Sequence, residues 1–213
     1  MDIHDFKNMQ VLNKLSLVLP NDTVVDVGAC RGIYVGYFHT RLGNTGKIYA
    51  VELSKANIDH MMLHCKNMSN IEWINAAASD KDGHDECFKG ITDQTYTLVG
   101  HDTSFNDLES MGNTKTVRLD TMLKDEESIK LVKIDVEGAE YDVLRGMKNV
   151  IHKVENILLE THFDEDWFAI RDLLITEYGF FLYDIQNERA VDWESPRPYQ
   201  CLCTKGYQVV RQK

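Results

Sequence analysis

The chain has 213 residues, of which 43% are apolar and 27% are charged. This is an ordinary globular balance for about one domain, and it excludes collagen, coiled coil and disorder. Lys and Arg number 23 against 34 Asp and Glu, so the formal net charge is −11. A charge of this sign repels phosphate backbones, and the basic residues form no cluster, so we expect no nucleic-acid partner.

Targeting signals and cysteines bear on the compartment. No apolar run approaches the roughly 18 residues that span a bilayer, and the N-terminus lacks the regions of a signal peptide. The five cysteines form no Cys-x-x-Cys pair, which argues against a zinc site or a disulfide framework. We therefore expect a reduced protein of the cytoplasm with no membrane span.

Apolar residues alternate between helical and strand patterns along the chain. The patterns predict helices near 2–19, 33–41, 58–68, 143–151 and 167–178. They predict strands near 23–27, 47–53, 71–78, 131–136 and 157–160, and an antiparallel pair near 180–185 and 199–203. Residues 80–120 break this rhythm with three short β-rich pieces, at 86–88, 96–99 and 116–119, and indicate an inserted β-hairpin region.

This alternation predicts an α/β fold with a doubly wound, mostly parallel, seven-stranded sheet. We expect a single domain overall, with an N-terminal helix within 1–20 and the main domain over 21–213. Ligands of such sheets bind outside the carboxyl ends of the strands, so the residues that follow each strand are the ones to inspect.

A glycine-containing turn follows the first predicted strand. It reads Asp26-Val-Gly28-Ala29-Cys30-Arg-Gly32, and its glycines allow a tight turn whose amides face a ligand, although a strand-to-helix turn alone also needs them. Glu52 ends the second predicted strand, 20 residues beyond Gly32, where a carboxylate can accept hydrogen bonds from both hydroxyls of a ribose.

The spacing in this turn separates two cofactor classes. A dinucleotide fingerprint starting at Gly28 needs glycine where Cys30 and Ile33 stand. The observed spacing instead suits a cofactor with an amino-acid part at the turn, which indicates S-adenosylmethionine (SAM), with Asp26 orienting that part.

Acidic residues follow two later strands. Asp135 and Glu137 are expected to point the same way if their strand continues that far, and they suit a sulfonium or a substrate hydroxyl. Glu140 falls in the first turn of a predicted helix, where the helix dipole favours an acid, so a structural role is expected. Glu160 and His162 follow the next strand, and His162 is a candidate general base or substrate contact.

Two of these motifs carry a family resemblance. The segments Val24–Gly32 and Val132–Gly146 closely resemble the FkbM family of SAM-dependent O-methyltransferases, and Asn75–Asp80, Val117–Thr121 and Leu158–His162 fit as well. The match covers about residues 23–185. A departure is Cys30-Arg31, where the family more often has Asn and a small or apolar residue.

The resemblance implies a Rossmann-like class I methyltransferase that transfers a methyl group from SAM to a hydroxyl, often of a sugar or a glycosylated natural product. The expected cofactor-binding residues are Asp26, Gly28, Ala29, Cys30, Gly32, Glu52, Leu53, Ala77, Ser79 and Asp135. The expected catalytic residues are Asp135, Glu137, Glu160 and His162. Some members of the broader family use a divalent ion (Mg²⁺ or Mn²⁺), for which Asp135, Glu160 and His162 are plausible ligands or bases.

Other readings remain open. The chain lacks the Asp/Asn-Pro-Pro-Tyr turn of amino-group methyltransferases and the Pro-Cys of cytosine-C5 enzymes. A hydroxylated natural product such as a polyketide is the alternative acceptor, and a non-catalytic SAM-binding module is the alternative function. Four aromatic residues are candidates to stack on a sugar ring, namely Tyr96, Phe105, Trp193 and Tyr199.

Overall fold

The computed structural model describes residues 3–89, 96–98 and 109–206. Its main sheet has eight strands in the order β11-β10-β12-β9-β8-β1-β2-β3. The parallel strands are β1 (Thr23–Val27), β2 (Lys47–Glu52), β3 (Ile71–Asn75), β8 (Ile129–Ile134) and β9 (Val154–Glu160). The antiparallel strands are β10 (Phe181–Asp184), β11 (Arg189–Ala190) and β12 (Gln200–Thr204).

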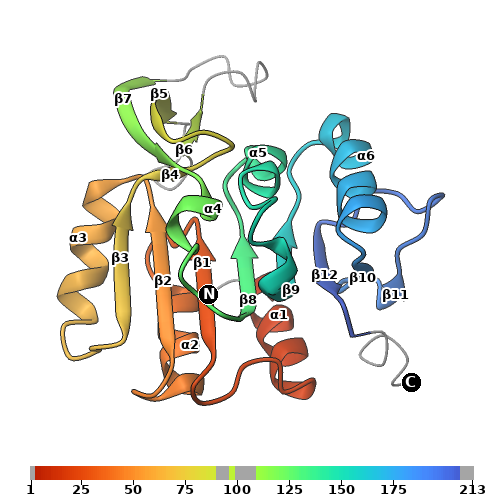
Figure 1. Cartoon of the computed structure of the whole chain (residues 1–213), viewed down its shortest axis with the longest axis horizontal. Helices are drawn as coiled ribbons and strands as arrows, with labels where there is room; N and C mark the ends of the chain where they lie inside the picture. Colours follow the sequence, from red (N-terminus) through yellow and green to blue (C-terminus); the bar gives the residue numbers. More distant parts are fainter. Residues whose placement is uncertain (1–2, 90–95, 99–108, 207–213) are drawn as a thin grey trace.

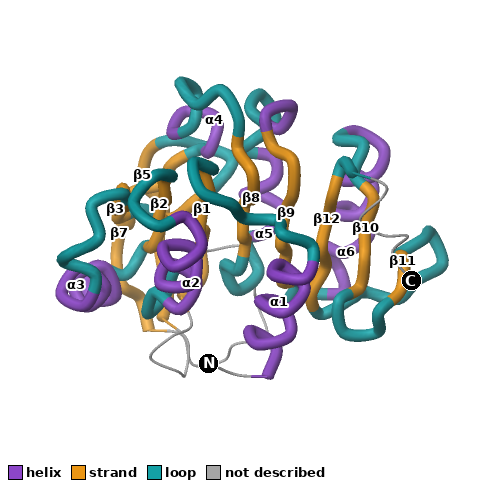
Figure 2. The backbone as a smooth tube through the Cα atoms, turned by 90° about the horizontal axis from the view of Figure 1, so that it is seen from below, coloured by secondary structure: helices purple, strands orange, loops and turns teal. Residues whose placement is uncertain are grey.

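Successive residues of each strand point to opposite faces of this sheet. Both faces carry apolar side chains, and helices cover both. Val24 packs with Leu12 and Phe38, whereas Val25 packs in another cluster with Leu144 and Trp167. One face carries α1 (Ile3–Lys14), α2 (Ile33–Leu42) and α3 (Lys55–His64). The other carries α4 (Leu119–Met122), α5 (Glu140–Arg145) and α6 (Asp164–Asp172), as Figure 2 shows. The predicted doubly wound α/β architecture is therefore confirmed.

The inserted region forms a second, four-stranded sheet in the order β4-β7-β5-β6. Its strands are β4 (Ala77–Ala78), β5 (Gly83–Lys89), β6 (Tyr96–Leu98) and β7 (Glu109–Val117). Figure 1 shows this small sheet standing above the carboxyl ends of the main strands. The insertion thus contributes to the end of the molecule where the fold class places its ligands.

Several element boundaries differ from the sequence expectation. The first helix ends at Lys14, and Ser16 has a φ of 49°, so 15–19 are not helical. Leu119 begins α4 instead of ending a strand. The strand before Asp135 ends at Ile134, so alternation along a strand does not orient the acids that follow. The two-residue β11 makes the sheet eight-stranded rather than seven-stranded.

The C-terminal half of the chain departs from the expected helices in two further places. The helix expected near 143–151 is α5 followed by a separate 3₁₀ turn, η1 (Ile151–Lys153). The helix expected near 167–178 continues beyond α6 as a π-helical segment, η2 (Leu173–Glu177). Among the described helices, none is both long and apolar enough to cross a membrane.

Candidate active site

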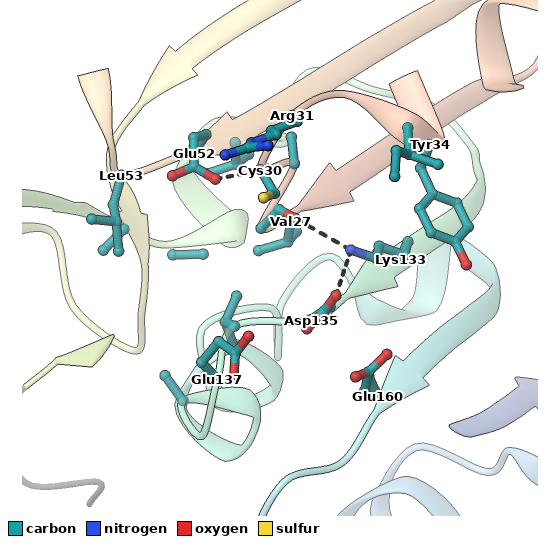
Figure 3. Close-up of a pocket in the computed structure, with 18 of the residues that line it drawn as sticks. Val27, Cys30, Arg31, Tyr34, Glu52, Leu53, Lys133, Asp135, Glu137 and Glu160 are labelled. Carbon is teal, nitrogen blue, oxygen red and sulfur yellow. Dashed lines mark hydrogen bonds and ion pairs between the residues drawn. The ribbon is translucent and has the colours of Figure 1, made fainter. Parts of the chain in front are cut away.

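A cavity of about 570 Å³ lies at the carboxyl ends of β1, β2, β8 and β9. β1 is flanked by β2 and β8, so this is the point where the strand order reverses, the usual ligand position in open α/β sheets. Figure 3 shows Glu52 and Cys30 on one side of the cavity, and Asp135, Glu137 and Glu160 on the other. We call these the turn side and the acid side.

The turn side is built mainly from backbone hydrogen bonds. Three residues of the turn, Gly28, Cys30 and Gly32, have positive φ angles of 78°, 49° and 81°. The N–H groups of Gly28 and Ala29 donate to the Val51 carbonyl at 2.9 and 3.1 Å. These two amides, expected to face a ligand, therefore bind β2 instead.

Glu52 completes the turn side. Its Oε2 accepts the Cys30 N–H at 2.8 Å, and its Oε1 accepts the Ser54 N–H at 2.8 Å. Burial raises the pKa of Glu52, and these amide hydrogen bonds oppose that rise by favouring the charged form. Both carboxylate oxygens are thus held by backbone amides at the cavity wall.

A buried lysine joins the two sides. Nζ of Lys133 donates to the Gly28 carbonyl at 3.2 Å and to Oδ2 of Asp135 at 3.0 Å, and lies 3.6 Å from Oδ1 of Asp26. Asp26 is fully buried, and this burial raises its pKa to about 6 although Lys133 lowers it. The attraction of Asp135 and Asp26 outweighs the desolvation of Lys133, so its pKa is raised and it stays charged.

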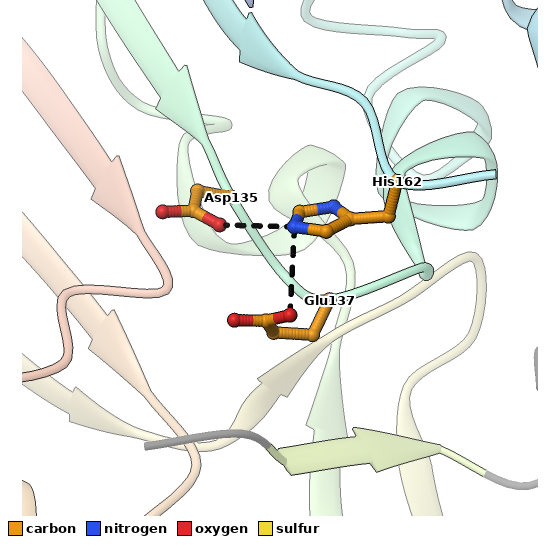
Figure 4. Close-up of side chains that lie close together, drawn as sticks. All are labelled: Asp135, Glu137 and His162. Carbon is orange, nitrogen blue, oxygen red and sulfur yellow. Dashed lines mark ion pairs between the residues drawn. The ribbon is translucent and has the colours of Figure 1, made fainter. Parts of the chain in front are cut away.

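The acid side gathers around His162. Its Nε2 lies 3.8 Å from Asp135, 3.5 Å from Glu137 and 3.7 Å from Glu160, and its Nδ1 lies 2.7 Å from Glu140. Figure 4 shows the ring reaching Asp135 and Glu137 from a different strand end. Burial lowers the pKa of His162, but the hydrogen bond and the charges of these acids outweigh it and raise the pKa to about 9.

The connection between β8 and α5 brings the acids to this ring. Glu137 has a φ of 54° and Gly138 a φ of 108°, so two successive residues adopt positive φ. A non-glycine residue in this conformation is strained by about 1–3 kcal/mol, a feature that gathers at functional sites. The backbone turn, and not strand alternation, therefore turns Glu137 toward the cavity.

The FkbM methyltransferase domain model matches residues 26–182, about three quarters of the chain, and includes both sides of the cavity. The chain belongs to the FkbM methyltransferase family. No curated protein matches this chain significantly.

Solved structures share the fold of this FkbM-family chain at low identity. FkbM methyltransferase from Methylobacillus flagellatus KT has a TM-score of 0.56 and 15% identity, over 86% of this chain and 43% of that one. The chain thus spans less than half of that structure's length. An rRNA methylase from Streptococcus thermophilus gives 0.54 and 13%, over 93% of each chain. Aeropyrum pernix fibrillarin with natively bound SAM gives 0.51 and 12%, over 92% of this chain and 73% of that one.

The structure brings most of the predicted site residues of this family member to the cavity. The predicted residues that line it are Gly28, Ala29, Cys30, Glu52, Leu53, Ala77, Asp135, Glu137 and Glu160. His162 stands behind three of these acids. Asp26, Gly32 and Ser79 do not line the cavity: Asp26 is buried beside Lys133, the Cα of Gly32 faces Met61, and the Ser79 N–H donates to the Val117 carbonyl.

Some lining residues were not predicted. They include Lys133, Tyr34 and Asp5, whereas Tyr199, one of the aromatic candidates for sugar stacking, does line the cavity. Lys133 had a local signal, because it stands near the carboxyl end of β8, the end of the strand at which ligands of such sheets bind. Asp5 and Tyr199 come from opposite ends of the chain, where no local pattern ties them to the motifs. Tyr199 is 38% exposed and its ring lies 4.9 Å from that of His4. Of the other aromatic candidates, Trp193 does not line the cavity, and Phe105 and the Tyr96 side chain fall outside the described residues.

Proposed function

We propose that this chain is a SAM-dependent O-methyltransferase that methylates a hydroxyl group, with a sugar or glycan as acceptor. The observation that carries this proposal is the two-sided cavity. Its turn side has an amide-held carboxylate among apolar walls, and its acid side has three carboxylates backed by a histidine. A cofactor and an acceptor thus have chemically different places in one cavity.

The turn side fits an adenosine cofactor. Val51, Leu53 and Ala77 give apolar wall beside Glu52, which suits an adenine ring next to a ribose diol. Oε2 of Glu52 holds one amide and keeps a second lone pair for a ribose hydroxyl, whereas Oε1 holds the Ser54 amide and a longer hydrogen bond of 3.4 Å from Nδ2 of Asn57. When bound, SAM supplies an electrophilic methyl group on a sulfonium.

The acid side fits proton removal from an alcohol. Glu137 lines the cavity, and burial together with the neighbouring acids raises its pKa, which makes its carboxylate a stronger base. Glu160 is engaged by Gln200 at 3.0 Å and Asp135 by Lys133. We therefore assign the base to Glu137, which would take the proton of the acceptor hydroxyl as its oxygen accepts the methyl group that bound SAM would supply, leaving the cofactor as a neutral thioether. His162 stabilises the charges around it.

A divalent ion is the second candidate for activating the hydroxyl. One ligand atom from each of Asp135, Glu137 and His162 lies within 4.8 Å of the others (Figure 4), a spacing that fits one ion. Mixed carboxylate and imidazole donors suit Mn²⁺ better than Mg²⁺, which prefers oxygen alone. These residues would then hold the ion, whose charge lowers the pKa of a bound hydroxyl.

The acceptor class follows from charge and shape. Carboxylates of Asp135, Glu137 and Glu160 suit the hydroxyls of a neutral polyol and repel phosphates, and the net charge is −11. On this ground nucleic acid is not the proposed acceptor, although an rRNA methylase shares the fold. The ring of Tyr199 at the cavity gives a surface for a sugar face. A polyketide hydroxyl is the alternative acceptor.

The state of the cysteines bears on the compartment. All five cysteines are unpaired, which supports a location in the reducing cytoplasm.

The decisive experiment is calorimetric titration with S-adenosylhomocysteine (SAH), with NAD as the parallel ligand, each with and without EDTA. We expect micromolar binding of SAH and none of NAD, and this result justifies a screen of sugar acceptors. Loss of SAM-dependent acceptor methylation in EDTA, restored by Mn²⁺, would favour the ion over Glu137 as the activating group. Binding of NAD, or of neither ligand, would overturn the proposed cofactor.

A further inference from the structure

Glu140 differs from the other acids around His162. It is only 1% exposed and does not line the cavity, whereas Asp135, Glu137 and Glu160 do. It also meets the opposite ring nitrogen, since its Oε1 accepts from Nδ1 of His162 at 2.7 Å. The three cavity acids face Nε2 at 3.5–3.8 Å, beyond hydrogen-bond distance. Glu140 therefore makes the one short contact that orients the imidazole among these four acids.

The backbone holds the Glu140 carboxylate in place. The N–H groups of Gly138 and Val136 donate to the same Oε1 at 3.1 and 3.3 Å. Both amides belong to the turn in which Glu137 and Gly138 have positive φ. Hydrogen bonds from two backbone N–H groups hold this carboxylate oxygen in one position. This acid is thus a fixed acceptor for the ring.

The chain at the end of β9, which carries His162, packs against the same turn. A Cβ on Gly138 would lie 2.1 Å from Cε2 of Phe163, so the Phe163 ring packs directly on the bare Cα. Phe163 is the neighbour of His162 in the chain. This contact keeps the end of β9 close to the β8–α5 turn, and so brings the ring within reach of Glu140.

We propose that Glu140 is the positioning residue of His162: it accepts the Nδ1–H and so directs Nε2 toward Asp135, Glu137 and Glu160. The functional meaning of this arrangement rests on the proposed methyl transfer. The positioning role of Glu140 applies whether His162 balances the charge of the neighbouring acids or binds an ion through Nε2. In both cases the ring is oriented by a contact at its other nitrogen, Nδ1. The helix dipole remains a favourable contribution at this position, but it is not what the carboxylate contacts.

The test is proton NMR of the full chain in EDTA at a fixed pH, together with SAH calorimetry. An imidazole N–H that donates to a buried carboxylate resonates far downfield of the amides and exchanges slowly. We expect one such signal in the parent, absent from His162→Gln, which assigns it, and absent from Glu140→Gln. The control is Asp142→Asn on the same helix, whose Oδ1 lies 3.9 Å from Nη1 of Arg145. We expect this control variant to keep the downfield signal.

The outcomes separate this inference from the proposed function. Persistence of the downfield signal in Glu140→Gln, or its absence from the parent, overturns the positioning role whether or not SAH binds. Failure of the parent to bind SAH overturns the proposed cofactor and leaves the NMR result decisive for Glu140. With an acceptor in hand, Glu140→Gln is expected to lower kcat by about 10–100-fold with SAH affinity unchanged. An equal loss in Asp142→Asn counts against the proposal.

Discussion

The two sides of the cavity hold their carboxylates by different means. On the turn side, Glu52 is held by backbone amides on both oxygens. On the acid side, Asp135, Glu137 and Glu160 surround one imidazole, and most of their contacts are between side chains. The first arrangement has a fixed charge and a fixed shape, which suits binding. The second has several groups whose protonation depends on one another, which suits chemistry.

The turn side and the acid side of the cavity contact each other at Gly28, and a substitution there is expected to have the largest effect on stability. A Cβ at Gly28 would lie 1.7 Å from the Asp135 carbonyl, and its φ of 78° adds strain. We expect Gly28→Ala to lower the free energy of unfolding by more than about 4 kcal/mol. Urea denaturation measures it. Gly36→Ala is the control, since its Cβ meets nothing within 4 Å and a helical alanine stabilises by about 1 kcal/mol. Equal effects at the two glycines would contradict this account.

Removing the charge of Glu137 tests the chemical role of the acid side. Glu137→Gln keeps the size of the side chain but not a basic carboxylate, so we expect kcat for methyl transfer to fall by about 10²–10⁴-fold. SAH affinity, which belongs to the turn side, stays within twofold of the parent on calorimetry (~0.4 kcal/mol). Glu127→Gln, at an exposed position outside the cavity, is the matched control. An unchanged kcat in Glu137→Gln would exclude Glu137 as the base.

The charge of His162 makes the acid side sensitive to pH. Its folded-state pKa of about 9 lies above the ordinary 6.5, so its protonated form stabilises the fold fully below pH 6.5. That stabilisation is lost as pH rises through about 9, by about 3 kcal/mol. Denaturant midpoints in EDTA measure it, and the loss in the parent should exceed the loss in His162→Gln. Parallel curves for the two proteins would show that the ring has an ordinary pKa.

The smallest expected effect concerns the turn side alone. Glu52→Gln leaves one oxygen acceptor where there were two, and we expect SAH to bind about tenfold more weakly (~1.4 kcal/mol). Glu72→Gln is a control on the neighbouring β3, outside the cavity. If Glu52→Gln binds SAH like the parent, the ribose does not contact this carboxylate.

The same contrast explains what the sequence predicts. The turn side depends on local patterns, and β1 spans Thr23–Val27 as expected from its apolar run. The acid side depends on contacts between distant segments. The position of Glu140 at the start of a predicted helix suggested only a helix-dipole role. Its partner, His162, is 22 residues away in the sequence, so no local pattern indicated the contact. Positive φ at Glu137, a residue type that seldom adopts it, has no local signal.

The other differences between the expected and the observed site have similar causes. Asp5 and Tyr199 reach the cavity from chain ends outside both motifs, and only the packed fold brings them there. Ser79 was expected at the cofactor from the family resemblance of Asn75–Asp80, but its N–H pairs with Val117 of the second sheet. Contacts between segments far apart in the chain decided these positions, and such contacts are not encoded in any local window.

The second sheet begins and ends at one place. Ala77 and Ala78 of β4 pair with Thr116 and Val117 of β7, so the chain enters and leaves the insertion through adjacent parallel strands. Because its two ends are joined this way, the insertion can lengthen, shorten or be exchanged between relatives without pulling β3 and β8 apart. Ala77 and Ala78 also line the cavity. The insertion is therefore attached to the main sheet at a single place, and a change in its length leaves the wall beside Glu52 where it is.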